Sequence, residues 1–140
     1  MSIREQILQS IVTRLAGTSG VGDRIFRSRV QALSRQESPA LVVTPASEEN
    51  NTLPGGVSDR YLTVRIDVVA RSETPDQEAD PVLASAHAKI MADTRLGGLS
   101  VNIEEVGTEW DLEDADSGAA LIAVQYRIQY RTRMKDLSSQ

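Results

Sequence analysis

Two segments of the chain alternate between apolar and polar positions, and they predict the two longest strands. In segment 119–134 the even positions are apolar from Ala120 to Tyr130, and the odd positions from Gln125 to Arg131 carry glutamine and arginine side chains. Segment 59–71 repeats the pattern, with Leu62, Val64, Ile66 and Val68 on one side. A period of two is typical of a strand with one buried face and one wet face. We expect these two strands to lie side by side as the centre of a single sheet.

A period close to 3.6 residues predicts two helices. Residues 2–15 place their apolar side chains on one stripe, Ser2 and Glu5 have the spacing of a capping box, and Gly17 ends the segment. The second helix ends near Asp93 and has two possible first turns, one at Pro75 and one at Pro81, because proline is tolerated at the first helical position.

Shorter apolar runs predict the remaining strands. They are a short extended piece at 24–29, a strand at 40–44 between two prolines, and strands at 99–106 and 109–113. Residues 46–58 are polar and rich in glycine and asparagine, so we expect a mobile loop that could form the tip of an extended hairpin. Residues 136–140 are expected to form a polar tail.

The order of these elements predicts the α+β class: one mostly antiparallel or mixed β-sheet with two long strands, packed by two α-helices. The 140 residues fit one domain with one core, so residues 1–140 are expected to form a single unit. Strands this long extend past a domain this small, and exposed strand edges invite pairing with another chain.

The chain contains few of the residue patterns that support chemistry. It has no cysteine, and His87 is its only histidine, which is more often a packing residue than a base. The glycines near Gly22 precede Asp23 rather than the Lys-Ser/Thr pair of a phosphate loop. The acid-rich run 104–116 lacks the glycine and glutamate spacing of a calcium loop. We therefore expect no enzyme activity, cofactor or bound metal.

The net charge of −5 argues against binding a phosphate backbone, and we expect no sequence-specific nucleic-acid partner. No apolar run approaches the ~20 residues that span a bilayer, so no membrane partner is expected. The charge is uneven, because residues 1–71 hold nine arginines against seven acids, whereas residues 72–140 hold thirteen acids against six bases.

Several phrases of the sequence occur together in an order typical of one family. After the amphipathic N-terminal helix come RIFRSRVQALSRQESPALVV and DRYLTVRIDVVAR, then ADPVLASAHAKIMAD, TRLGGLSVNIEEVGTEWDLEDAD and AVQYRIQYRTR. This layout resembles the tail terminator, or tail completion, proteins of long-tailed bacteriophages and prophages, of the lambda minor tail protein U type. The resemblance covers almost the whole chain.

The resemblance implies an α+β subunit that forms a ring, usually a hexamer, at the head-proximal end of the virion tail. The ring caps the tail tube, stops its polymerisation and provides the head-joining surface, after assembly in the host cytoplasm. The implied partners are further copies of the chain, the major tail tube protein and head–tail connector proteins.

A head-to-tail ring needs two different, complementary surfaces on each subunit. The basic region 24–35 and the acidic run 104–116 are candidates, and two arginines of the last predicted strand are further candidates. The candidate interface residues are Arg24, Arg27, Arg29, Arg35, Glu104, Glu105, Glu109, Asp111, Glu113, Arg127 and Arg131. Two alternatives stay open: a head-completion or neck connector protein, and a small dimeric α+β ligand-binding domain or enzyme.

Overall fold

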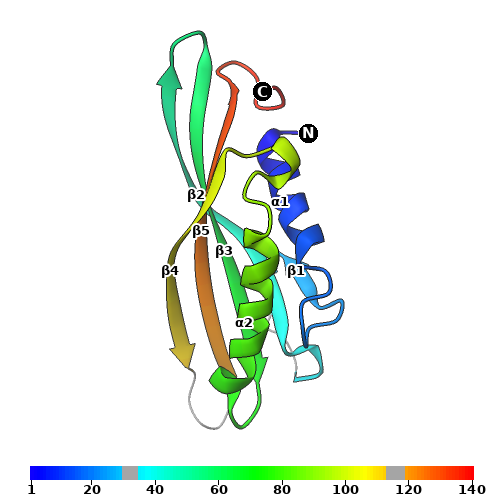
Figure 1. Ribbon diagram of the computed structural model, residues 1–140. Coiled ribbons are helices and arrows are strands. Elements are labelled where there is room, and N and C mark those ends of the chain that lie inside the picture. The colour runs from blue at the N-terminus through cyan, green and yellow to red at the C-terminus, as the bar shows by residue number, and fades with distance from the viewer. Residues whose placement is uncertain (30–34, 113–118) are drawn as a thin grey trace.

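The computed structural model describes residues 1–29, 35–112 and 119–140, and it has one five-stranded mixed sheet with two α-helices on one face (Figure 1). This confirms the predicted α+β class. The elements in chain order are α1 (Ile3–Leu15), β1 (Ile25–Arg27), the 3-10 turn η1 (Arg35–Glu37), β2 (Ala40–Leu53), β3 (Val57–Arg71), α2 (Pro75–Met91), the 3-10 turn η2 (Leu96–Gly98), β4 (Asn102–Leu112) and β5 (Ala119–Arg133).

The two long strands predicted from alternation are neighbours at the centre of the sheet, whose order is β1-β2-β3-β5-β4. Strands β3 and β5 pair antiparallel from Val57 opposite Arg133 to Arg71 opposite Ala119, without a bulge. Among the described strands, β1 and β2 are the one parallel pair. The predicted central pair is therefore confirmed, and β1 and β4 form the two edges.

The core lies between the helices and the even-numbered positions of β3 and β5. Tyr126, Ile128, Leu62 and Ile66 are almost fully buried there, together with the apolar stripe of α1. Among the described residues, the opposite face of the sheet holds a small apolar cluster around Ala40 and the apolar start of β5, and the rest of β3 and β5 on that face is mostly polar. One face of the sheet thus carries the main core, as the alternation predicted.

The prediction of a loop at 46–58 was wrong. Strand β2 continues through this segment to Leu53, and β3 begins at Val57, so only a tight turn separates them. Gly55 and Gly56 have φ of 87° and 77°, a conformation that glycine adopts without steric cost. The segment is the outer part of an extended hairpin that projects beyond the helices (Figure 1). The predicted mobility of this segment remains a prediction.

A bulge between Pro45 and Ser47 lets β2 continue past its proline. A second bulge, between Glu105 and Gly107, merges the two strands predicted at 99–106 and 109–113 into the single strand β4. Its last predicted residue, Glu113, lies outside the described residues.

Helix α2 begins at Pro75, the earlier of the two predicted starts, and contains Pro81. The expected polar tail, residues 136–140, turns back toward the first helix, where the Leu137 carbonyl accepts a hydrogen bond from the Ile3 amide at 2.8 Å. Among the described residues, neither helix has the length and apolar character needed to cross a bilayer.

Candidate interaction surfaces

The basic region lies at the β1 edge of the sheet. Both terminal nitrogens of Arg27 donate to the Glu5 carboxylate on α1, at 2.7 and 2.9 Å. The hydrogen bonds from Arg27 lower the pKa of Glu5. A groove of about 500 Å³ runs beside this pair, lined by α1 residues and Arg27. The charge of Arg27 is therefore compensated by an acid of the same chain.

Two other predicted arginines of this region, Arg29 and Arg24, also have partners within the chain. Arg29 donates to both oxygens of Glu37, at 2.6 and 3.2 Å, and its guanidinium lies 4.6 Å from the centre of the Phe26 ring. Arg24 donates to the carbonyls of Pro39 and Gly20, at 3.0 and 2.8 Å. Arg35 begins η1, and its side chain lies outside the described residues.

Four of the predicted acids lie on β4, at the opposite edge of the sheet. Glu104 faces Arg127 of β5 at 3.2 Å, and Glu105 lies 3.8 Å from the His87 ring on α2. Glu109 and Asp111 are exposed and form no ion pair within the described part of the chain. The basic region and the acidic strand therefore stay apart, on the two edges of one sheet.

The same strand exposes apolar side chains. Trp110 is 61% exposed and Leu112 is 59% exposed, and Val106 at the bulge is also exposed. By register, Trp110 and Leu112 lie opposite Ile122 and Ala120, on the helix-covered face. Helix α2 packs on β3 and β5. Ile103 at the start of β4 is buried in the core, but Trp110 and Leu112 on the same face are exposed, so the end of β4 lacks the cover that its described neighbours have. Sequence alternation indicates which side of the strand is apolar, but it cannot show that no helix covers it.

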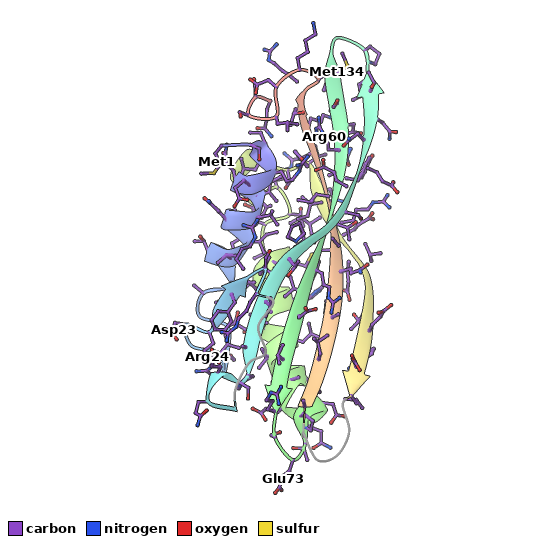
Figure 2. The ribbon with its side chains drawn as sticks, turned by 180° about the vertical axis from the view of Figure 1, so that it is seen from behind. Met1, Asp23, Arg24, Arg60, Glu73 and Met134 are labelled. Carbon is purple, nitrogen blue, oxygen red and sulfur yellow. The ribbon has the colours of Figure 1, made fainter. Side chains whose placement is uncertain are left out.

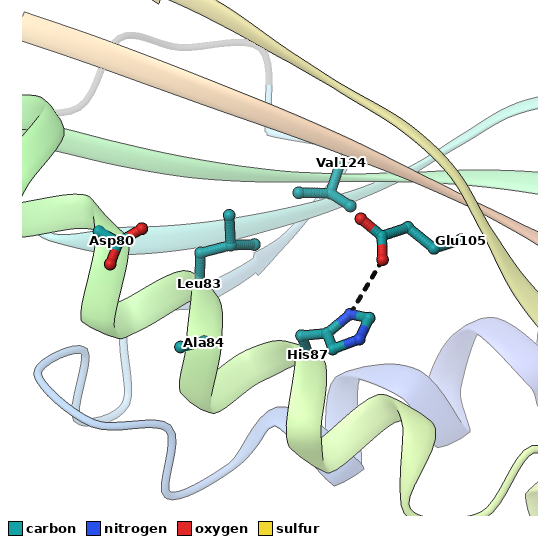
Figure 3. Close-up of a pocket in the computed structure, with 6 residues that line it drawn as sticks. All are labelled: Asp80, Leu83, Ala84, His87, Glu105 and Val124. Carbon is teal, nitrogen blue, oxygen red and sulfur yellow. Dashed lines mark ion pairs between the residues drawn. The ribbon is translucent and has the colours of Figure 1, made fainter.

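A pocket of about 220 Å³ lies between α2 and β4 (Figure 3). His87 and Glu105 face each other across it, and the His87 Nδ1 atom is 2.8 Å from the Tyr126 hydroxyl. Leu83 and Val124 form its apolar part. Burial, helped by the nearby Glu105 charge, raises the pKa of Tyr126, so this phenol stays protonated and serves as a hydrogen-bonding group. Among the described residues, no group of three or more acidic or histidine side chains is placed to hold a metal ion.

The base of the projecting hairpin holds an ionic cluster that the sequence did not indicate. The Glu48 carboxylate accepts hydrogen bonds from Arg4 of α1 at 2.6 Å, from Arg60 of β3 at 3.3 Å and from the Tyr130 hydroxyl of β5. The Arg60 Nε atom also donates to Thr132 at 2.9 Å. Four elements therefore meet at one carboxylate, whose side chain is only 12% exposed.

The pKa values of this cluster follow from its contacts. Burial raises the pKa of Glu48, but the hydrogen bonds from Arg4 and Tyr130 outweigh burial, so the net shift is downward. Burial and the bond to Glu48 raise the pKa of Tyr130 to about 12. The stable state at neutral pH is an ionised carboxylate between two guanidinium groups and a protonated phenol.

The predicted residue Arg131 follows Tyr130 on β5 but lies on the other face of the sheet, where its Nε atom is 3.3 Å from Asp59. Beyond it, Arg133, Met134 and Lys135 are exposed at the end of the sheet where Figure 2 labels Met134. Of these four residues, only Arg131 was predicted as a candidate interface residue.

A solved structure resembles the chain over nearly its full length. It is a chain of the "Virion of native gene transfer agent (GTA) particle", with a TM-score of 0.58 and 13% sequence identity over 93% of this chain and 92% of that chain. The two chains share one fold. No protein-family model matches the chain, and no curated protein matches its sequence.

Proposed function

We propose that this chain is a virion structural protein that forms the tail terminator ring. The ring would cap the tail tube, stop its polymerisation and provide the surface that joins the head. The observation that carries this proposal is the near full-length fold likeness to a chain of a gene transfer agent virion. The sequence phrases that resemble tail terminator proteins of the lambda minor tail protein U type support it independently.

The arrangement of the sheet also supports a ring. Its two edges differ, because β1 lies beside basic residues and β4 carries acids and exposed apolar side chains. Two different surfaces of this kind suit a heterologous, head-to-tail contact. Such a contact forms a ring when repeated rotation from one subunit to the next returns to the first subunit. The projecting hairpin adds a surface beyond the body for a neighbour or for the tube.

The alternative of a ligand-binding domain or enzyme requires a concave site in which polar groups converge. The pocket beside His87 is small, and two of its six lining residues are acids on different elements with no nucleophile between them. This site is better explained as the gap left between α2 and an uncovered strand.

The proposal is tested by deleting the gene from the phage or prophage that carries it. We expect tails of uncontrolled length without attached heads under the electron microscope, with normal tails restored by the wild-type gene. Tails of normal length that fail to join heads would instead identify a head-completion or neck protein. Normal, infectious particles would reject both structural roles.

A further inference from the structure

Strand β4 separates its charged and apolar side chains onto two faces. By register, Glu104, Glu109 and Asp111 lie on the face away from the helices, whereas Trp110 and Leu112 lie on the helix side. All of these side chains are exposed, and β4 is an edge strand. We call these five residues, with Val106, the β4 surface. It combines a large exposed aromatic side chain with the negative charges of Glu109 and Asp111, which form no ion pair among the described residues, whereas Glu104 is paired with Arg127. Aromatic residues are enriched at protein interfaces.

The charge of the β4 surface restricts what can bind it. Pairing of two β4 strands around a twofold axis would bring Glu109 and Asp111 of one copy near the same acids of the other, and like charges in an interface are unfavourable. A suitable partner must bring basic side chains together with apolar ones.

The chain itself carries such a segment at the other end of the sheet. Arg131, Arg133 and Lys135 are exposed around the exposed Met134. Arg133 and Lys135 form no ion pair among the described residues, and Arg131 has only the contact with Asp59. We call these four residues the basic end. Figure 2 shows Met134 and Glu73 at opposite ends of the long axis, and β4 runs toward the Glu73 end, because Leu112 pairs with Ala120 and Ala120 pairs with Ala70.

We propose that the β4 surface of one subunit binds the basic end of a second copy of this chain. The contact is heterologous, since its two halves are different surfaces, and it places Trp110 and Leu112 against Met134 while the acids face the bases. The proposal deepens the proposed function and rests on it only for the closed ring. In this contact the basic end, and not the basic region 24–35, supplies the positive charge that faces the acids of β4, because Arg27 and Arg29 are already paired within the chain.

Trp110 gives a direct readout because it is the only tryptophan of the chain. We expect red-shifted, acrylamide-quenchable emission from dilute protein. As concentration rises in low salt, we expect a blue shift and loss of quenching at the same concentrations at which sedimentation velocity detects oligomers. An oligomer whose Trp110 stays fully quenchable, or a chain that stays monomeric at every concentration, overturns the proposal.

Charge reversal tests the pairing of the two surfaces. We expect E109K/D111K and R133E/K135E each to raise the dissociation constant at least about tenfold in low salt, and the combined fourfold variant to recover most of the loss. The control E49K/E73K makes the same charge change at two other exposed acids and should assemble as the wild type does. Equal loss in the control, or no recovery in the fourfold variant, contradicts the proposal.

Replacing the aromatic side chain tests the apolar half. We expect W110A to raise the dissociation constant about tenfold or more, with unchanged circular dichroism and melting temperature, because the side chain is exposed in the single subunit. Unchanged assembly in W110A would contradict this half of the contact. These assembly measurements test the contact between copies, whereas the gene deletion tests the role in the tail. The deletion can change tail length, or leave it normal, regardless of which surfaces join the copies.

Discussion

The guanidinium of Arg4 lies 2.6 Å from the carboxylate of Glu48, which joins the first turn of α1 to β2. Glu48 lies beyond Val43, the last residue of β2 that pairs with β1. The ion pair thus connects the helix to the start of the projecting hairpin, in the part of β2 that no longer pairs with β1.

We expect E48Q to destabilise the fold by about 2 kcal/mol or more, because it leaves Arg60 with a weaker partner in a site where that arginine is buried. Urea unfolding with an unchanged m-value measures the loss. E49Q, one residue away and exposed, should change stability by less than about 0.5 kcal/mol. Similar values for the two variants would show that the cluster contributes nothing to stability.

Acidic pH should lower the unfolding free energy through protonation of Glu48. The folded-state pKa of Glu48 lies below its usual value of 4.5, so the folded state binds fewer protons than the unfolded state. Its stabilisation is complete above about pH 4.5 and is lost as the pH falls through the lowered pKa. We therefore expect the difference in unfolding free energy between wild type and E48Q to shrink between pH 7 and pH 3. A constant difference would contradict the ionised state of Glu48.

The contribution of Asp67 to stability should change with pH in the opposite direction. Burial raises its pKa above 3.8, although Arg65 opposes the shift with a hydrogen bond at 2.6 Å. Its favourable contribution is complete below pH 3.8 and is lost as the pH rises through the raised pKa. We expect D67N to stabilise the fold at pH 7, by less than about 1 kcal/mol, and to have no such effect at pH 3. The exposed D111N variant is the control, and a destabilised D67N at pH 7 would disprove this reasoning.

The pair of Glu5 and Arg27 should contribute to folding rather than to assembly. A double-mutant cycle with E5A and R27A should give a coupling of about 0.2–1 kcal/mol that falls as salt is added. The dissociation constant of R27A oligomers should equal that of the wild type. If R27A assembled more weakly and showed no coupling to Glu5, Arg27 would instead belong to the subunit interface that was predicted from the sequence.

The central strands and both helices could be predicted because their apolar residues repeat with one clear period. Every even position from Leu62 to Ala70 faces the core, and no bulge disturbs the register with β5. The end of β2 gave no such signal, because Glu48, Asn50 and Thr52 are polar on the face where a core residue would be expected. That face meets an ionic cluster instead of the apolar core.

The positions and partners of the candidate interface residues could be predicted only in part, because many of their contacts join distant segments. The acids of β4 are close in sequence and were predicted as one acidic run, but on two separate strands, because the bulge that joins them has no signal in the alternation. The partner of Arg27 is Glu5, 22 residues earlier on a different element, and no local pattern indicates that they meet. The exposure of Trp110 depends on where α2 packs, which is a property of the tertiary structure.

The uninterrupted register of β3 and β5 has a mechanical consequence. Both flanking ladders contain a bulge, but the central one does not, from the tip at Val57 to Arg71. A pull along the hairpin axis loads the hydrogen bonds of this ladder in shear, so they resist together instead of opening one after another. Tension applied at the tip is carried by the central two strands into the part of the sheet beneath α2.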